Sequence, residues 1–121
     1  LLDVLCLGTG VIRRKPDIKW QRKKENINEI TKIQMQILET CSKYLKKGGE
    51  LVYSTCSIFE EENQNIIDSF LNKNPEYKIS RYENITNNVE ISKYLVENKY
   101  IKIYPNNTND GFFICKIYKK D

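Results

Sequence analysis

The side chains of this sequence that are best suited to covalent chemistry are the thiols of four cysteines, at positions 6, 41, 56 and 115. Two of them follow stretches that are typical of buried strands, since Cys6 follows residues 1–5 and Cys56 follows Glu50–Thr55. A helix is predicted directly after Cys56, and the partial positive charge at a helix N-terminus favours a thiolate. Cys56 is therefore a candidate nucleophile; the alternative is that it is only a small buried residue.

The same cysteines argue against a metal site and against a redox motif. They lie too far apart for a CxxC pair, and the chain contains no histidine. Two disulfides in a secreted protein are an alternative, but the cysteine density is low and the N-terminal run contains an acid, unlike a signal peptide. No apolar run approaches the roughly 20 residues that span a bilayer. We expect reduced thiols in a cytoplasmic protein, with no metal and no membrane partner.

Basic residues crowd one short stretch of the chain, whose formal net charge is +4. The cations between positions 13 and 24 are opposed there only by one aspartate; they are Arg13, Arg14, Lys15, Lys19, Arg22, Lys23 and Lys24. Such a block attracts polyanions, and a solvated surface loop is the alternative reading of the charge. The candidates for contacts with RNA phosphates are Arg13, Arg14, Lys19 and Arg22.

A helix over residues 26–46 is the clearest of the elements that must position these side chains. Its apolar residues recur at three- and four-residue spacing; they are Ile27, Ile30, Ile33, Ile37, Leu38, Cys41, Tyr44 and Leu45. Asn26 and Glu29 form a variant capping box, and Gly48-Gly49 is typical of a helix end. This pattern places Cys41 on a buried face, as a core residue.

The second helix is predicted from Ser57 or Phe59 to Lys73, with a capping box of Ser57 and Glu60 at its start. Further along, a strand is predicted over residues 77–82, a short helix near 88–97, and two strands over 100–104 and 111–119 joined by a turn. Cys115 falls on a buried face of the last strand.

Alternation of strands and helices indicates an α/β fold with a mostly parallel sheet and an antiparallel strand at the C-terminus. Ligands of such sheets bind at the carboxyl ends of the strands. Cys6 and Cys56 follow consecutive strands, and consecutive strands are usually neighbours. We therefore expect the two thiols to face one pocket.

Three segments resemble one known family, the Sun (Fmu)-type RNA (cytosine-C5) methyltransferases. Residues 3–20 read D-V-L-C-L-G-T-G-V-I-R-R-K-P-D-I-K-W, close to the family stretch D-A-P-C-S-G-T-G-V-I-R-R-x-P-D-I-K-W. Residues 51–58 read L-V-Y-S-T-C-S-I and are followed by E-E-N at 61–63, as in the family. The closing P…D-G-F-F segment matches residues 105–113. The R-R-x-P-D-I-K-W run is most similar to the bacterial subgroup that acts on 16S rRNA.

The resemblance implies a partial Rossmann-like S-adenosylmethionine-dependent methyltransferase fold. By resemblance Cys56 is the thiolate that adds to C6 of cytosine, Cys6 assists release of the product, and Asp3 lies near the cofactor and the target base. The partner is RNA, with 16S rRNA expected, and the target base must be unstacked to be reached. We expect residues 1–121 to be the C-terminal part of one catalytic domain, inactive alone, with most of the S-adenosylmethionine site in the absent N-terminal part.

Two positions beside Cys6 depart from the family pattern. Leu5 stands where the family has proline, and Leu7 stands where it has serine. Leucine lacks the fixed backbone angle of proline and the hydroxyl of serine, so these changes bear on the placement of Cys6. A non-catalytic RNA-binding fragment, or the product of a decayed gene, is the alternative function.

Overall fold

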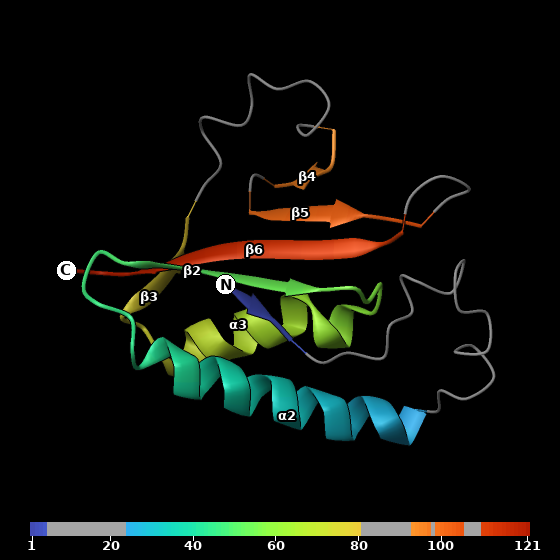
Figure 1. Ribbon diagram of the computed structural model, residues 1–121, viewed down its shortest axis with the longest axis horizontal. Coiled ribbons are helices and arrows are strands. Elements are labelled where there is room, and N and C mark those ends of the chain that lie inside the picture. Colours follow the sequence, from blue (N-terminus) through green and yellow to red (C-terminus); the bar gives the residue numbers. More distant parts are fainter. Residues whose placement is uncertain (5–23, 81–92, 98, 106–109) are drawn as a thin grey trace.

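The computed structural model describes residues 1–4, 24–80, 93–97, 99–105 and 110–121, which form one six-stranded sheet with helices packed against it (Figure 1). The strands are β1 (Leu2–Asp3), β2 (Glu50–Thr55), β3 (Tyr77–Ile79), β4 (Leu95–Val96), β5 (Tyr100–Ile103) and β6 (Phe112–Lys119). The helices are α2 (Lys24–Ser42), the short 3-10 helix η2 (Glu60–Glu62) and α3 (Gln64–Lys73).

The sheet has the strand order β1-β2-β6-β5-β4, and β3 pairs with the C-terminal part of β6. β1 and β2 are parallel, as predicted for consecutive strands, with Leu2 opposite Tyr53 and Asp3 opposite Ser54. β6 is antiparallel to β2, β3 and β5, which confirms the prediction for the C-terminal strand. Among the described strands antiparallel pairings outnumber parallel ones, whereas the sequence predicted a mostly parallel sheet. The reason is that β6 lies in the middle of the sheet, between β2 and β5, rather than at its edge.

The core lies between the sheet and the two α-helices, which run together along one side of it (Figure 1). Side chains alternate along β2, so that Leu51, Tyr53 and Thr55 are buried while Val52 and Ser54 are only half-buried. The fully buried apolar and aromatic side chains include Leu38, Tyr53, Ile67, Phe70, Phe113 and Ile117. Burial of each such side chain stabilises the fold by about 1.5–3 kcal/mol.

Helix α2 ends four residues earlier than predicted, at Ser42 rather than 46. The two glycines do not end the helix; they make the turn into β2, in which the Gly49 amide donates to the Lys46 carbonyl at 2.8 Å. Gly48 there adopts a φ of 77°, a left-handed conformation that favours glycine. The buried stripe of α2 also differs from the predicted one, because Gln34 is fully buried whereas Ile33 and Tyr44 are exposed.

The second helix is shorter than predicted, because the segment after Cys56 is a loop followed by η2. The helix α3 begins only at Gln64, and the predicted capping box of Ser57 and Glu60 is wrong. The Ser57 hydroxyl instead donates to the Glu62 carboxylate and accepts from the Phe59 amide at 3.1 Å. These contacts hold the chain away from helical geometry over the first residues after β2.

The helix predicted near 88–97 is also corrected over its described part, where Leu95–Val96 form strand β4 against β5. Residues 88–92 lie outside the described part of the chain. None of the helices in the described ranges is both long and apolar enough to cross a membrane.

Candidate active site

Cys56 lies in a bend immediately after β2, at the carboxyl end of the strand, and its side chain is half-buried. β1 ends beside the same part of β2, and the Val4 amide extends the pairing by donating to the Ser54 carbonyl at 3.1 Å. The predicted meeting of the two strand ends is therefore confirmed. The thiol of Cys6 lies outside the described residues, so its expected approach to Cys56 stays a prediction.

Asp3 faces Ser54 across the two parallel strands. The Ser54 hydroxyl donates a hydrogen bond to Asp3 Oδ1 at 3.1 Å, and the pair is exposed. Since side chains alternate along a strand, Asp3 and Ser54 lie on the face of the sheet opposite to Leu2 and Tyr53. An acid and a hydroxyl thus stand at the carboxyl end of a parallel pair, where α/β sheets bind their ligands.

A buried network of polar side chains surrounds the loop that carries Cys56. Thr55 Oγ1 donates to Asn63 Oδ1 at 2.5 Å, and Asn63 Nδ2 donates to the Ser57 carbonyl at 2.9 Å. The Ser57 amide donates in turn to Thr55 Oγ1 at 3.2 Å. Thr55, Ser57 and Asn63 are all at most 1% exposed. Buried polar groups are costly unless paired, so this network defines one conformation of the loop.

Glu62 anchors the network to the rest of the domain although it is itself fully buried. Its carboxylate accepts hydrogen bonds from the Ser57 hydroxyl and, at 3.1 Å, from Gln34 Nε2 on α2. Its main-chain carbonyl accepts from the Tyr53 hydroxyl at 2.7 Å. In the sequence, the E-E-N run at 61–63 and the polar residue at 34, one turn before Leu38, are the signals that could have identified this cluster.

The predicted activation of Cys56 by a helix N-terminus is not what the structure shows. Seven residues separate Cys56 from α3, and the short η2 lies between them. The candidates for phosphate contacts, Arg13, Arg14, Lys19 and Arg22, lie outside the described residues, so their role stays a prediction.

Strand β6 pairs with β2 along its length, and Phe113 lies opposite Thr55 in the antiparallel register. The Phe113 ring contacts Tyr53 edge-on at 6.3 Å between centroids and Tyr100 at 5.3 Å. The Tyr100 hydroxyl donates to Asp68 Oδ1 at 3.1 Å, and burial together with that carboxylate raises the pKa of Tyr100. The aromatic layer gives the end of β2 a firm apolar support.

The remaining cysteines have structural positions. Cys115 is fully buried in β6, as predicted, and burial, assisted by the charge of Asp68, raises its pKa to about 12. Cys41 is half-buried and packs against the core from α2. Neither thiol lies in the loop after β2, so Cys56 is the described thiol placed for chemistry.

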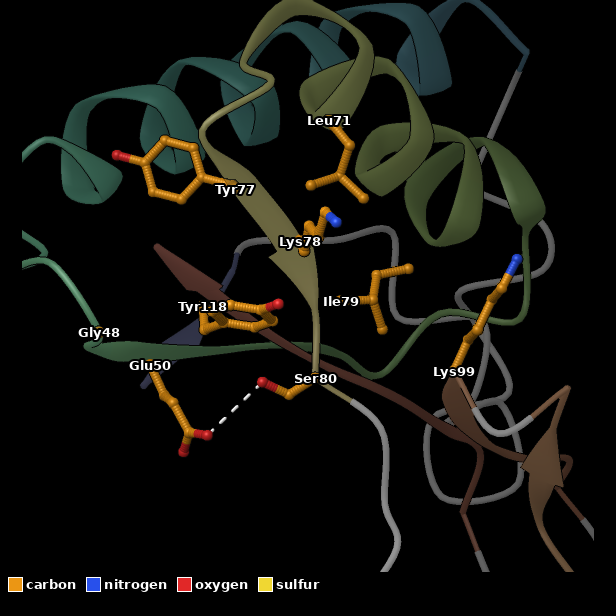
Figure 2. Close-up of a pocket in the computed structure, with 9 residues that line it drawn as sticks. All are labelled: Gly48, Glu50, Leu71, Tyr77, Lys78, Ile79, Ser80, Lys99 and Tyr118. Atoms are coloured by element: carbon orange, nitrogen blue, oxygen red, sulfur yellow. Dashed lines mark hydrogen bonds between the residues drawn. The ribbon is translucent and has the colours of Figure 1, made fainter. Parts of the chain in front are cut away.

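A pocket of about 810 Å³ opens at the other end of β2. Figure 2 shows Glu50, Tyr77, Ser80 and Tyr118 around it, with the Ser80 hydroxyl directed to the Glu50 carboxylate at 3.5 Å. Glu50 begins β2 and Cys56 follows its last residue, a separation of roughly 20 Å along the strand. The pocket is therefore separate from the candidate active site.

Comparison with protein families gives a match over residues 1–118 to the model described as 16S rRNA methyltransferase RsmB/F. The chain is 43% identical over 120 residues to ribosomal RNA small subunit methyltransferase B of Yersinia pseudotuberculosis serotype O:1b (strain IP 31758). The same identity is found with the protein of that name from Yersinia pestis bv. Antiqua (strain Angola). The match covers 99% of this chain but 26% of each relative, so the chain spans about a quarter of their length.

Solved structures with the same fold include the protein PH0851, with a TM-score of 0.83 and 34% identity over 98% of this chain and 26% of that one. NSun6 from Pyrococcus horikoshii, solved with the S-adenosylmethionine analogue SFG, gives a TM-score of 0.78 and 29% identity, covering 99% of this chain and 29% of that one. These neighbours confirm the predicted Rossmann-like methyltransferase fold.

Proposed function

Because the chain belongs to the RsmB/F family of 16S rRNA methyltransferases, we propose that it carries the nucleophile of an enzyme that methylates C5 of a cytosine in ribosomal RNA. The observation that carries the proposal is the position of Cys56. This thiol follows the carboxyl end of β2, two positions after Ser54, which pairs with Asp3, and lies in a loop whose conformation the buried network defines.

C5 of cytosine is by itself too poor a nucleophile to be methylated. The reaction therefore requires a thiolate that first adds to the ring at C6. The Cys56 sulfur forms a bond to C6, the C5–C6 double bond opens, and its electron pair makes C5 nucleophilic. After C5 has gained a methyl group, loss of its proton restores the double bond and expels the Cys56 thiolate. Cys6 is proposed to assist this release, as the resemblance implies.

Asp3 is the residue of this chain that fits a contact to the cofactor or to the target base. Its carboxylate is exposed at the carboxyl end of β1 and is oriented by the Ser54 hydroxyl. A carboxylate there can accept hydrogen bonds from the amino group at the edge of the base and so orient the ring for attack by the thiolate. S-adenosylmethionine, when bound, supplies an electrophilic methyl group. We propose that most of its site belongs to the part of the family domain that this chain does not contain.

The test uses a chimera in which this chain replaces the matching segment of the Yersinia pseudotuberculosis relative. Incubation with unmodified 16S rRNA transcript and labelled S-adenosylmethionine should place the methyl group on C5 of a cytosine. Cys56→Ala should abolish both the methylated product and any RNA adduct, whereas Cys41→Ala should not. Product formation by the Cys56→Ala chimera would contradict the proposal, and RNA binding without any product would favour a non-catalytic module.

A further inference from the structure

We propose that Asn63 is a positioning residue for Cys56, an inference that rests on the nucleophilic role proposed above. Asn63 does not touch the reacting atoms in this proposal. Its side chain instead bridges the two residues on either side of Cys56, and so determines where the thiol stands relative to C6 of the base.

The bridge is a closed set of three hydrogen bonds. The Asn63 carbonyl oxygen accepts from the Thr55 hydroxyl at 2.5 Å, and its amide nitrogen donates to the Ser57 carbonyl at 2.9 Å. The Ser57 amide closes the set by donating to the Thr55 hydroxyl at 3.2 Å. Cys56 is the residue enclosed between these two flanks. A single buried carboxamide therefore connects the end of β2 to the loop that follows the nucleophile.

The use of the Asn63 side chain for this bridge differs from its usual use at the start of a helix. Asn63 is the N-cap residue of α3, and its main-chain carbonyl accepts from the Ile66 and Ile67 amides. Asparagine at this position commonly caps the helix through its side chain, which contributes about 1 kcal/mol. Here the side chain makes no capping hydrogen bond. It is directed to the Cys56 loop instead, so holding that loop is its structural effect.

Glu62 strengthens the bridge from the other side of Ser57. The Ser57 hydroxyl donates to the Glu62 carboxylate, and Gln34 holds the second carboxylate oxygen at 3.1 Å. Ser57 is thus attached to α2 through Glu62 and to β2 through Asn63. A loop held on two sides has little freedom to shift the residue before Ser57, which is Cys56.

Such rigidity matters for the proposed reaction. Bond formation requires sulfur and C6 to approach in an aligned geometry, and a displacement of about 1 Å can lower the rate about 100-fold. The network makes no contribution to binding RNA phosphates, since its side chains are fully buried. Loss of the bridge should therefore lower the rate of the chemical step and leave RNA binding nearly unchanged.

Three variants separate the effect of the hydrogen bonds in the bridge from the effect of side-chain size. Asn63→Asp keeps the size but removes the donor to the Ser57 carbonyl. Thr55→Val keeps the shape but removes the hydroxyl that both donates to Asn63 and accepts from Ser57. Thr55→Ser keeps the hydroxyl and is the matched control. Because a second carboxylate beside Glu62 can impair folding of Asn63→Asp, the Thr55 pair provides an independent comparison, and thermal unfolding verifies each fold.

The experiment measures methyl transfer, RNA binding and intrinsic thiol reactivity in the same chimera. We expect Asn63→Asp and Thr55→Val to lower kcat about 100-fold while KM for the RNA changes less than about threefold. Alkylation of Cys56 by iodoacetamide, followed by mass spectrometry of its peptide, should stay within about threefold of the unmodified chimera, because a small reagent needs no positioned thiol. Thr55→Ser should match the unmodified chimera in all three measurements.

The outcomes distinguish this proposal from the one on which it rests. An unmodified chimera that forms neither adduct nor product overturns the nucleophilic role, and the positioning role with it. An active chimera whose folded Asn63→Asp and Thr55→Val variants keep their kcat overturns the positioning role alone. A fall in kcat that is matched by an equal fall in Cys56 alkylation also overturns it, because the network would then act on thiol reactivity rather than on position.

Discussion

The Ser54 hydroxyl donates a hydrogen bond to the Asp3 carboxylate, with 3.1 Å between Oγ and Oδ1, across the parallel pairing of β1 and β2. The two residues are 51 positions apart in the sequence, yet they stand side by side at the end of the sheet where Cys56 follows. The acid of the proposed site is therefore oriented by the same strand that presents the nucleophile.

Substitution of these two residues should affect the reaction to different degrees. Asp3→Asn replaces a carboxylate oxygen, which is proposed to accept a hydrogen bond from the base, by an amide nitrogen that cannot accept one, so methyl transfer by the chimera should fall about 100-fold or more. Ser54→Ala removes only one exposed hydrogen bond, worth about 1 kcal/mol, and should lower the rate about fivefold. Ser69→Ala, an exposed serine on α3, is the control. Equal losses for Asp3→Asn and Ser69→Ala would remove Asp3 from the site.

Cys6→Ala should trap an intermediate. If Cys56 adds to the base and Cys6 assists release, the Cys6→Ala chimera should accumulate a protein–RNA adduct that survives a denaturing gel. Cys41→Ala, a half-buried thiol on α2, should give no such adduct. Leu5 and Leu7 flank Cys6, so the double change Leu5→Pro and Leu7→Ser should release adduct if those leucines already impair its role. Normal turnover by the Cys6→Ala chimera would show that the assigned role is mistaken.

The basic segment should contribute to RNA affinity through phosphate contacts. Each contact with single-stranded RNA contributes about 0.7 to the slope of log K against log salt concentration, so four contacts contribute about 3. Replacing Arg13, Arg14, Lys19 and Arg22 by alanine should reduce the slope by that amount, similarly for different RNA sequences. The control replaces four exposed lysines elsewhere, Lys43, Lys46, Lys47 and Lys120. An equal effect of both sets on the slope would mean that the segment acts only through net charge.

Cys115 should make stability depend on pH in the alkaline range. Burial raises its folded pKa from 9.0 to about 12, so the folded chain keeps a proton that the unfolded chain releases. The resulting stabilisation is fully present below pH 9 and is lost as the pH rises toward about 12. Urea unfolding between pH 8 and about pH 11 should show this decline, and Cys115→Ala should flatten it while lowering stability at every pH through the cavity it leaves. A slope unchanged in Cys115→Ala would contradict the assignment.

Much of the fold could be predicted because its signals are local. Alternating side chains and β-forming residues identified β2 with its observed bounds, Glu50–Thr55. Consecutive strands were expected to be neighbours, and β1 indeed pairs with β2. The motif around Cys56 and the order of the elements carried the resemblance, which the match over residues 1–118 supports. These features depend on residues within one element or one short run.

The surroundings of Cys56 were decided by tertiary structure. Capping rules predicted a helix directly after the cysteine, but buried bonds from Ser57 to Glu62 and from Asn63 to Thr55 outweigh that local preference and make a loop. Periodicity likewise favoured Ile33 as a core residue, whereas Gln34 is buried because Glu62, 28 residues away, accepts its hydrogen bond. The sequence by itself determined which residues could do chemistry and which strands would carry them. Their hydrogen-bond partners come from distant parts of the chain, and only the packed fold brings those parts together.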